Sequence, residues 1–213
     1  SLLESNIIVA KQSSKEIVEC IKKNISNNKA NKYFFNEDYN FVSMENDFFY
    51  YEDKYGGLKI PKPGMSGQFQ LENASTAIAS LRILENLKIK DEQIVKGIKN
   101  AYNSARLEEI KSGKLKDLVK NNRLIIDSSH NPGGSKAINE YLQTLNCNKH
   151  VIVGMMENKD HEKFLSYFKN ISSLTVVDIP NQINAISGMK LKEKLKNVSN
   201  LIYKESIGQA IKS

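Results

Sequence analysis

One stretch of the sequence constrains the fold more than any other, because it marks the passage from a strand to a helix. Residues 123–135 read Arg-Leu-Ile-Ile-Asp-Ser-Ser-His-Asn-Pro-Gly-Gly-Ser. Its apolar run, Leu124 to Ile126, is rich in β-branched residues and would be apolar on both faces of a strand. This predicts a buried parallel strand over 123–127. Pro132 suits the first turn of a helix that has Asn131 as its N-cap. The pattern therefore predicts a strand-to-helix junction in an α/β sheet.

Polar side chains are concentrated at this junction. Asp127, Ser129 and His130 lie where the predicted strand ends, which is where open α/β sheets bind ligands. The two glycines that follow allow a ligand to approach the backbone. An ionised Asp127 only accepts hydrogen bonds, so it suits two neighbouring sugar hydroxyls. A polar loop with a capped helix explains the same residues without a ligand, and His130 could simply bond the loop backbone.

The rest of the chain predicts two domains. Helices alternate with strands after residue 123, which favours a doubly wound, mostly parallel sheet. Before residue 102 the pattern gives helices and a small antiparallel patch around the turn Asn46-Asp47. Another short strand is expected over 115–119. The aperiodic residues 102–105 mark the best boundary, so we expect domains over 1–104 and 105–213.

Composition excludes several classes of protein. The chain has 213 residues, of which 40% are hydrophobic and 26% charged, as in soluble globular proteins. No apolar run reaches membrane-spanning length, and the first residues have no signal-peptide pattern. Cys20 and Cys147 are far apart in the sequence, so we expect them to be reduced, as in the cytoplasm.

The basic net charge indicates small anionic ligands rather than nucleic acid. The 31 basic and 24 acidic residues give a net charge of +7. These charges are spread over the chain, and no nucleic-acid recognition motif accompanies them. Nucleotides and polycarboxylates are therefore the expected partners.

Asn73 and Arg106 are two further candidate site residues. Asn73 lies in the first turn of a predicted alanine-rich helix over 71–86, where its amide could pair with a nucleobase edge or with the helix backbone. Arg106 follows the predicted boundary, and its planar guanidinium suits an anionic ligand. A surface arginine after a linker is the plain alternative.

Three motifs together resemble the folylpolyglutamate synthase / dihydrofolate synthase family of Mur-type ligases. In chain order they are Gly67-x-Phe-Gln-x-x-Asn-Ala74, Arg106-Leu-Glu108 and Asp127-Ser-Ser-His-Asn-Pro132. The resemblance implies an α/β fold. Residues 1–104 would form the C-terminal portion of the central P-loop-type ATPase domain, and residues 105–213 a Rossmann-like C-terminal domain.

The resemblance also implies an activity. Members are ATP-dependent amide ligases that convert a dihydropteroate or folate carboxylate to an acyl phosphate and then join L-glutamate to it. Mg²⁺ stabilises the negative charge of the phosphates in this reaction. The resemblance further implies a cytoplasmic monomer whose partners are ATP, L-glutamate and dihydropteroate or folate. Two alternatives stay open: another Mur-type ligase with an amino-acid or peptide substrate, and a non-catalytic nucleotide-binding module.

The family's site residues carry over to four positions. Asn73 matches the contact to the adenine end of ATP, Arg106 the arginine that reaches the nucleotide, and Asp127 the ribose-binding aspartate. His130 matches a histidine on the glutamate side and is the catalytic candidate. The chain departs from the family before the arginine, where Ser104-Ala105 replaces Pro-Gly.

The sequence contains no Gly-x-x-x-x-Gly-Lys-[Ser/Thr] phosphate loop. The family's magnesium ligands would precede residue 1, so we expect no metal site within these residues. We also expect the 213 residues alone to be inactive, as one piece of a longer ligase.

Overall fold

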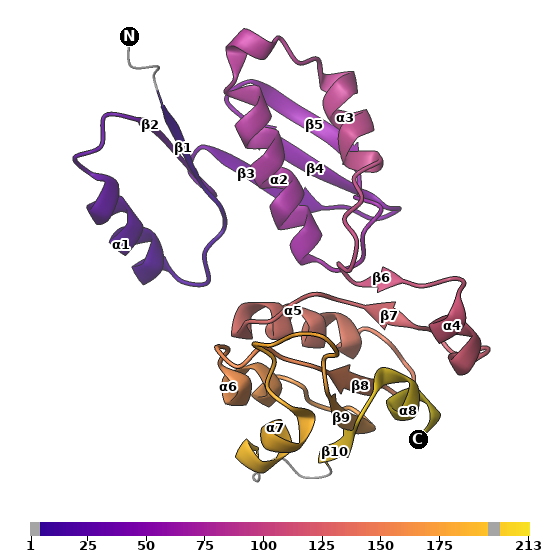
Figure 1. The fold of residues 1–213 in the computed structure, drawn as a ribbon. Coiled ribbons are helices and arrows are strands. Elements are labelled where there is room, and N and C mark those ends of the chain that lie inside the picture. The colour runs from indigo at the N-terminus through magenta and orange to yellow at the C-terminus, as the bar shows by residue number, and fades with distance from the viewer. Residues whose placement is uncertain (1–4, 196–200) are drawn as a thin grey trace. The chain divides into compact units, whose positions relative to one another are not determined.

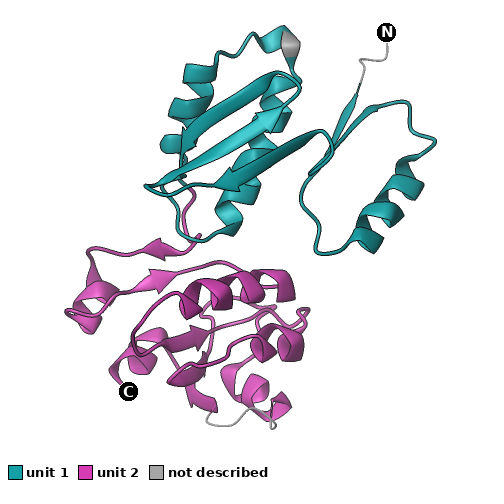
Figure 2. Cartoon of the chain, turned by 180° about the vertical axis from the view of Figure 1, so that it is seen from behind, with its two compact units in different colours: residues 1–102 teal, residues 103–213 magenta. Residues whose placement is uncertain are grey.

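The chain folds into two compact units. The computed structural model describes residues 5–195 and 201–213 (Figure 1). The units are Ser1–Tyr102 and Asn103–Ser213, coloured separately in Figure 2. Each unit has a hydrophobic core of its own. The expected α/β class is confirmed, with a parallel sheet and a small antiparallel patch.

The first unit combines a parallel strand pair with a three-stranded antiparallel sheet. Its elements are β1 (Asn6–Val9), α1 (Lys15–Ile25), β2 (Asn31–Phe34), β3 (Tyr39–Ser43), β4 (Phe48–Asp53), β5 (Gly56–Pro61), α2 (Phe69–Arg82), a 3₁₀ turn η1 (Glu85–Leu87) and α3 (Asp91–Lys99). The predicted hairpin is present. Asn46 and Asp47 both have φ of 59° between β3 and β4, a conformation that Asn and Asp tolerate in tight turns.

One face of the antiparallel sheet carries the core of the first unit. Helices α2 and α3 lie along this face (Figure 1), where Phe49, Tyr51, Ile60 and Ile78 are fully buried. A buried ion pair joins α2 to β4, since Arg82 Nη1 donates to Asp53 Oδ1 at 2.8 Å. The packing therefore fixes α2, which carries Asn73, against the sheet.

The second unit is built around a three-stranded parallel sheet in the order β10-β9-β8. Its elements are β6 (Glu108–Glu109), α4 (Lys114–Val119), β7 (Ile125–Ile126), α5 (Pro132–Gln143), β8 (His150–Val153), α6 (His161–Ser166), β9 (Ser173–Val177), α7 (Gly188–Lys194), β10 (Leu201–Lys204) and α8 (Ile207–Lys212). The central strand β9 is almost continuously buried, as expected of a parallel strand covered on both faces.

The expectation of a buried parallel strand over 123–127 is wrong. β7 has two residues and pairs antiparallel with β6, and Ile126 is 37% exposed. β7 forms a two-stranded sheet with β6, separate from the parallel sheet β10-β9-β8. The strand expected over 115–119 is also wrong. It is the helix α4, consistent with the helical spacing of Leu115, Leu118 and Val119.

None of the helices in the described residues combines the length and the apolar character needed to cross a membrane.

Candidate nucleotide-binding residues

Arg106 lies at the tip of a short loop with an unusual backbone. The residues on either side of it have positive φ, 53° at Ala105 and 48° at Leu107. Neither is glycine, so each residue adopts a conformation that costs roughly 1 kcal/mol or more. The Arg106 side chain is exposed, whereas Leu107 is buried at 3% exposure. The loop thus anchors its hydrophobic residue and presents the guanidinium to solvent.

Asp127 holds this loop in place. Its Oδ2 accepts a hydrogen bond from the Leu107 backbone amide at 2.9 Å, and its Oδ1 accepts one from the Ser129 amide at 2.8 Å. A backbone bond from the Ser128 amide to the Ala105 carbonyl, also 2.8 Å, runs beside them. The loop is further closed by Glu108, whose Oε2 accepts from the Ala105 amide at 2.8 Å.

Asp127 keeps acceptor capacity after these contacts. The residue is partly exposed, so it lies at the surface rather than deep in the core. An ionised carboxylate offers about four lone-pair sites, and the two backbone amides occupy two of them. The same side chain can therefore organise the loop and accept hydrogen bonds from ligand hydroxyls.

His130 is exposed and is oriented by its own loop. Its Nδ1 lies 3.1 Å from the Ser128 carbonyl oxygen. A carbonyl only accepts, so Nδ1 carries the hydrogen, and in the neutral ring Nε2 is then the unprotonated acceptor. The backbone contact that the sequence left open is present, and it leaves the second ring nitrogen available for chemistry.

The polar loop of residues 127–131 ends where α5 begins, at Pro132. Asn131 is the N-cap, as predicted, and its Oδ1 accepts from the Gly134 amide at 2.8 Å. Gly134 is required for close packing, because a Cβ there would lie 2.5 Å from Cβ and Oγ of Ser129. The glycine therefore lets the Asp127–His130 loop lie directly on the helix.

Asn73 belongs to the first unit and is exposed on the first turns of α2. Its Nδ2 donates to Oε1 of Gln70 at 3.2 Å. The helix follows Gly67, which has φ of 102°, and its N-cap residue Gln68 makes no side-chain capping bond. The Asn73 amide is thus engaged by a neighbouring side chain rather than by the helix backbone.

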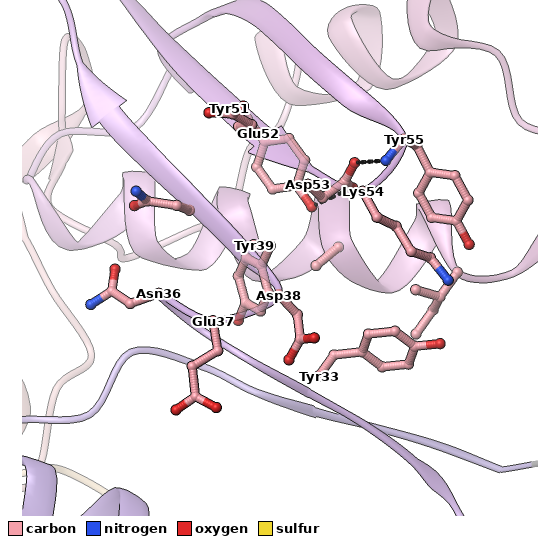
Figure 3. Close-up of a pocket in the computed structure, with 13 residues that line it drawn as sticks. Tyr33, Asn36, Glu37, Asp38, Tyr39, Tyr51, Glu52, Asp53, Lys54 and Tyr55 are labelled. Carbon is pink, nitrogen blue, oxygen red and sulfur yellow. Dashed lines mark hydrogen bonds between the residues drawn. The ribbon is translucent and has the colours of Figure 1, made fainter.

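A separate pocket of about 390 Å³ lies elsewhere in the first unit (Figure 3). Lys54 extends between the rings of Tyr33 and Tyr55, with Nζ 5.6 Å and 4.8 Å from their centroids. Asp53 at its base is paired with Arg82 and accepts from the Tyr51 hydroxyl at 2.8 Å. Burial, reinforced by this hydrogen bond to Asp53, raises the pKa of Tyr51. The thirteen described residues that line the pocket do not include the predicted site residues.

The structure brings three of the four predicted residues into two adjoining loops of the second unit: Arg106, Asp127 and His130.

Sequence reasoning missed two groups that hydrogen-bond to predicted site residues, the side chain of Gln70 and the backbone amide of Leu107. Gln70 had a readable signal, because it lies four and eight residues before the buried Ala74 and Ile78 of α2, on the same helix face. The Leu107 amide had no such signal in the sequence, because every residue except proline has a backbone amide. The described residues contain no group of three or more histidine, cysteine, aspartate or glutamate side chains that could hold a metal ion.

Comparison with solved structures gives strong likenesses of fold. A Mycobacterium tuberculosis folylpolyglutamate synthase, complexed with ADP and AMPPCP, is 17% identical with a TM-score of 0.80, covering 96% of this chain and 46% of that chain. Escherichia coli FolC, in complex with DHPP and ADP, is 22% identical with a TM-score of 0.73, covering 95% and 45%. A bifunctional folylpolyglutamate synthase/dihydrofolate synthase from Yersinia pestis, complexed with AMPPNP and Mn ion, is 19% identical with a TM-score of 0.73, covering 95% and 45%.

This chain spans somewhat less than half the length of each of these three proteins. A search of curated protein sequences gives no significant match. The model of the family described as Mur ligase, glutamate ligase domain, matches residues 105–213, which is more than half of the chain. The matched segment contains Arg106, Asp127, His130 and the parallel sheet β10-β9-β8. The chain therefore belongs to the Mur ligase family, through its glutamate ligase domain.

Proposed function

We propose that this chain is part of an ATP-dependent amide ligase that joins L-glutamate to dihydropteroate or folate. The observation that carries the proposal is the Asp127 carboxylate, which ties down the loop of Arg106 while keeping acceptor capacity. A guanidinium on a loop that an acceptor-only carboxylate holds suits a nucleotide, whose phosphates are anionic and whose ribose offers two adjacent hydroxyls. The ADP, AMPPCP and AMPPNP complexes of proteins with this fold support the choice of nucleotide.

Different residues of the chain would bind different parts of the nucleotide. Arg106 would bind nucleotide phosphates, because guanidinium hydrogen bonds to phosphate oxygens are charge-assisted and often bidentate. Asp127 would accept from the ribose hydroxyls. Asn73, in the first unit, would contact the adenine through its amide. The hydrogen bonds that hold the disfavoured backbone at Ala105 and Leu107 would keep the arginine loop in its binding geometry before the nucleotide arrives.

The proposed reaction forms an acyl phosphate from the acceptor carboxylate and the terminal phosphoryl group of ATP. The amino group of L-glutamate then attacks the acyl carbon, phosphate leaves, and one proton is lost from the amine. His130 would take that proton on Nε2, which the Nδ1 contact to the Ser128 carbonyl leaves as the basic nitrogen. A divalent cation would neutralise phosphate charge in such a reaction, and the described residues offer no cluster to hold one.

The reaction can be tested on the protein expressed from its complete native gene. ADP release that depends on L-glutamate should occur with dihydropteroate or a folate as acceptor. ADP release with a peptidoglycan precursor, and with neither pteroate nor folate, would instead identify another Mur-type ligase. Nucleotide binding without ADP release on any acceptor would identify a non-catalytic module.

The role of the arginine has its own test. Arg106→Ala should lower kcat/KM for ATP roughly tenfold or more, because it removes charge-assisted hydrogen bonds to phosphate. Arg123→Ala is the matched control, since Arg123 is a half-exposed arginine of the same unit that pairs with Glu109. Equal effects of the two substitutions would contradict the assignment.

A further inference from the structure

Two carboxylates hold the residues on either side of Arg106. On one side, Glu108 Oε2 accepts from the Ala105 amide at 2.8 Å. On the other, Asp127 Oδ2 accepts from the Leu107 amide at 2.9 Å. Glu108 begins β6, and Asp127 directly follows β7, the strand with which β6 pairs. The loop of Arg106 is therefore held at both ends by side chains of one two-stranded ribbon.

The backbone of Ala105 is the part of the loop that depends on Glu108. Its φ of 53° is left-handed, a conformation that alanine avoids because its Cβ crowds a backbone oxygen. The Ala105 carbonyl accepts from the Ser128 amide at 2.8 Å, so the bond to Glu108 completes a pair that holds this residue. Without the carboxylate, Ala105 could relax toward the right-handed region. The direction in which the chain enters Arg106 would then change.

The negative charge of Glu108 does not itself favour a phosphate ligand. A carboxylate two residues from a phosphate-binding arginine repels the phosphate, because the two charges have the same sign. What Glu108 supplies to the loop is an acceptor oxygen at the right distance from the Ala105 amide. A neutral side chain of the same length with an acceptor oxygen, such as glutamine, would supply the same hydrogen bond.

We infer that Glu108 is a positioning residue: it keeps Ala105 left-handed and thereby orders Arg106 for the phosphates of a nucleotide. The inference rests on the proposed function, in which Arg106 binds phosphate. Glu108 acts through the backbone of the loop and not through contact with the nucleotide. Because only the ordered fraction of the loop binds, loss of the acceptor should weaken the apparent affinity in proportion to the fraction that becomes disordered.

The test measures ATP affinity by titration calorimetry on the protein expressed from its complete native gene. Glu108→Ala should weaken ATP binding roughly tenfold, because the loop loses a hydrogen bond to a charged group. Glu108→Gln keeps an acceptor and should stay within roughly threefold of the wild type. Adding Ala105→Gly to Glu108→Ala should also return the affinity to within roughly threefold, since glycine adopts positive φ about as readily as negative φ. Glu109→Ala is the matched control, because Glu109 is the next residue of β6 and pairs with Lys111 and Arg123.

The outcomes separate this inference from the proposed function. If Glu108→Gln binds as weakly as Glu108→Ala, or if Ala105→Gly restores nothing, the positioning role is overturned while ATP binding by the wild type stands. Lower stability of Glu108→Ala with unchanged ATP affinity also overturns it, because that is a purely structural role. Failure of the wild-type protein to bind ATP would overturn both. If Glu108→Ala does not fold, hydrogen exchange of the wild type decides: a protected Ala105 amide supports the inference, and an unprotected one overturns it.

Discussion

The carboxylate of Asp127 accepts a hydrogen bond from the backbone amide of Leu107, 20 positions earlier in the chain, at 2.9 Å. Leu107 has positive φ, so the bond stabilises a backbone conformation that a leucine would otherwise avoid. The residue proposed to bind ribose is thus also the residue that shapes the loop of Arg106. Loss of the carboxylate should consequently affect both structure and binding.

Asp127→Ala should leave the Leu107 and Ser129 amides without their acceptors. We expect a loss of roughly 1–3 kcal/mol in the free energy of unfolding and weaker ATP binding, without unfolding of the domain. Hydrogen exchange should accelerate at these two amides. Asp117→Ala, which changes an exposed aspartate of α4, is the control and should leave both amides protected. Unchanged exchange in Asp127→Ala would contradict the loop-holding role.

Ala105→Gly should stabilise the protein. Ala105 has φ of 53°, a left-handed conformation that glycine adopts without the steric cost of a Cβ. We expect a gain of roughly 0.5–1 kcal/mol in the free energy of unfolding, measured by urea denaturation. Ala101→Gly removes the same methyl group from a residue without positive φ and should be neutral or destabilising. A loss of stability in Ala105→Gly would show that the loop conformation is not the one described.

Arg82→Met should strongly destabilise the first unit. Arg82 and Asp53 have side chains that are each only 7% exposed, so the substitution leaves a buried carboxylate without its cation. Removing one partner of a buried pair typically costs roughly 3–5 kcal/mol, which urea denaturation can measure. Lys11→Met is the control, because the pair of Lys11 with Glu72 is exposed and should contribute roughly 0.5 kcal/mol or less. Similar losses in the two variants would refute a special role for burial.

The carboxyl group of Glu157 should have a pKa below the usual value for glutamate. Hydrogen bonds from Lys194 and Lys190 on α7 lower the pKa of Glu157. Because the folded-state pKa is below the unfolded value, the contribution to stability is present above the unfolded pKa and is lost as pH falls through the folded pKa. NMR titration should show the depressed midpoint, and Lys190→Met with Lys194→Met should return it toward the usual value. High salt should act in the same direction, because the groups are exposed.

Elements with a periodic pattern could be predicted from the sequence. The helix behind Asn131-Pro132 and the buried strand β9 follow from capping residues and continuous hydrophobicity, which are local properties. The two errors differ in kind: β7 is a short segment that depends on its pairing with β6, whereas α4 has a helical spacing that was present in the sequence. A segment of two residues carries no period that could reveal its partner.

The candidate site could be predicted in its side chains but not in its backbone. Asp127 and His130 were identifiable because polar groups stand out before a proline and two glycines, and Arg106 because it directly follows the aperiodic residues 102–105. Their arrangement depends on amides of Leu107 and Ser129 and on left-handed backbone at Ala105, which any residue type can supply or adopt at a cost. Gln70 was visible as a polar residue on a buried helix face, yet its contact with Asn73 needed coordinates.

Gly133 and Gly134 look equivalent in the sequence but face different surroundings. A methyl group at 133 would meet only Asn131 Oδ1 at 3.5 Å, an ordinary contact, whereas one at 134 would overlap Ser129. Substitutions at 134 must therefore push aside the segment that carries Asp127 and His130, while position 133 has room to spare. Anyone wishing to attach a probe or a cross-linker near this loop can use the first glycine and should leave the second untouched.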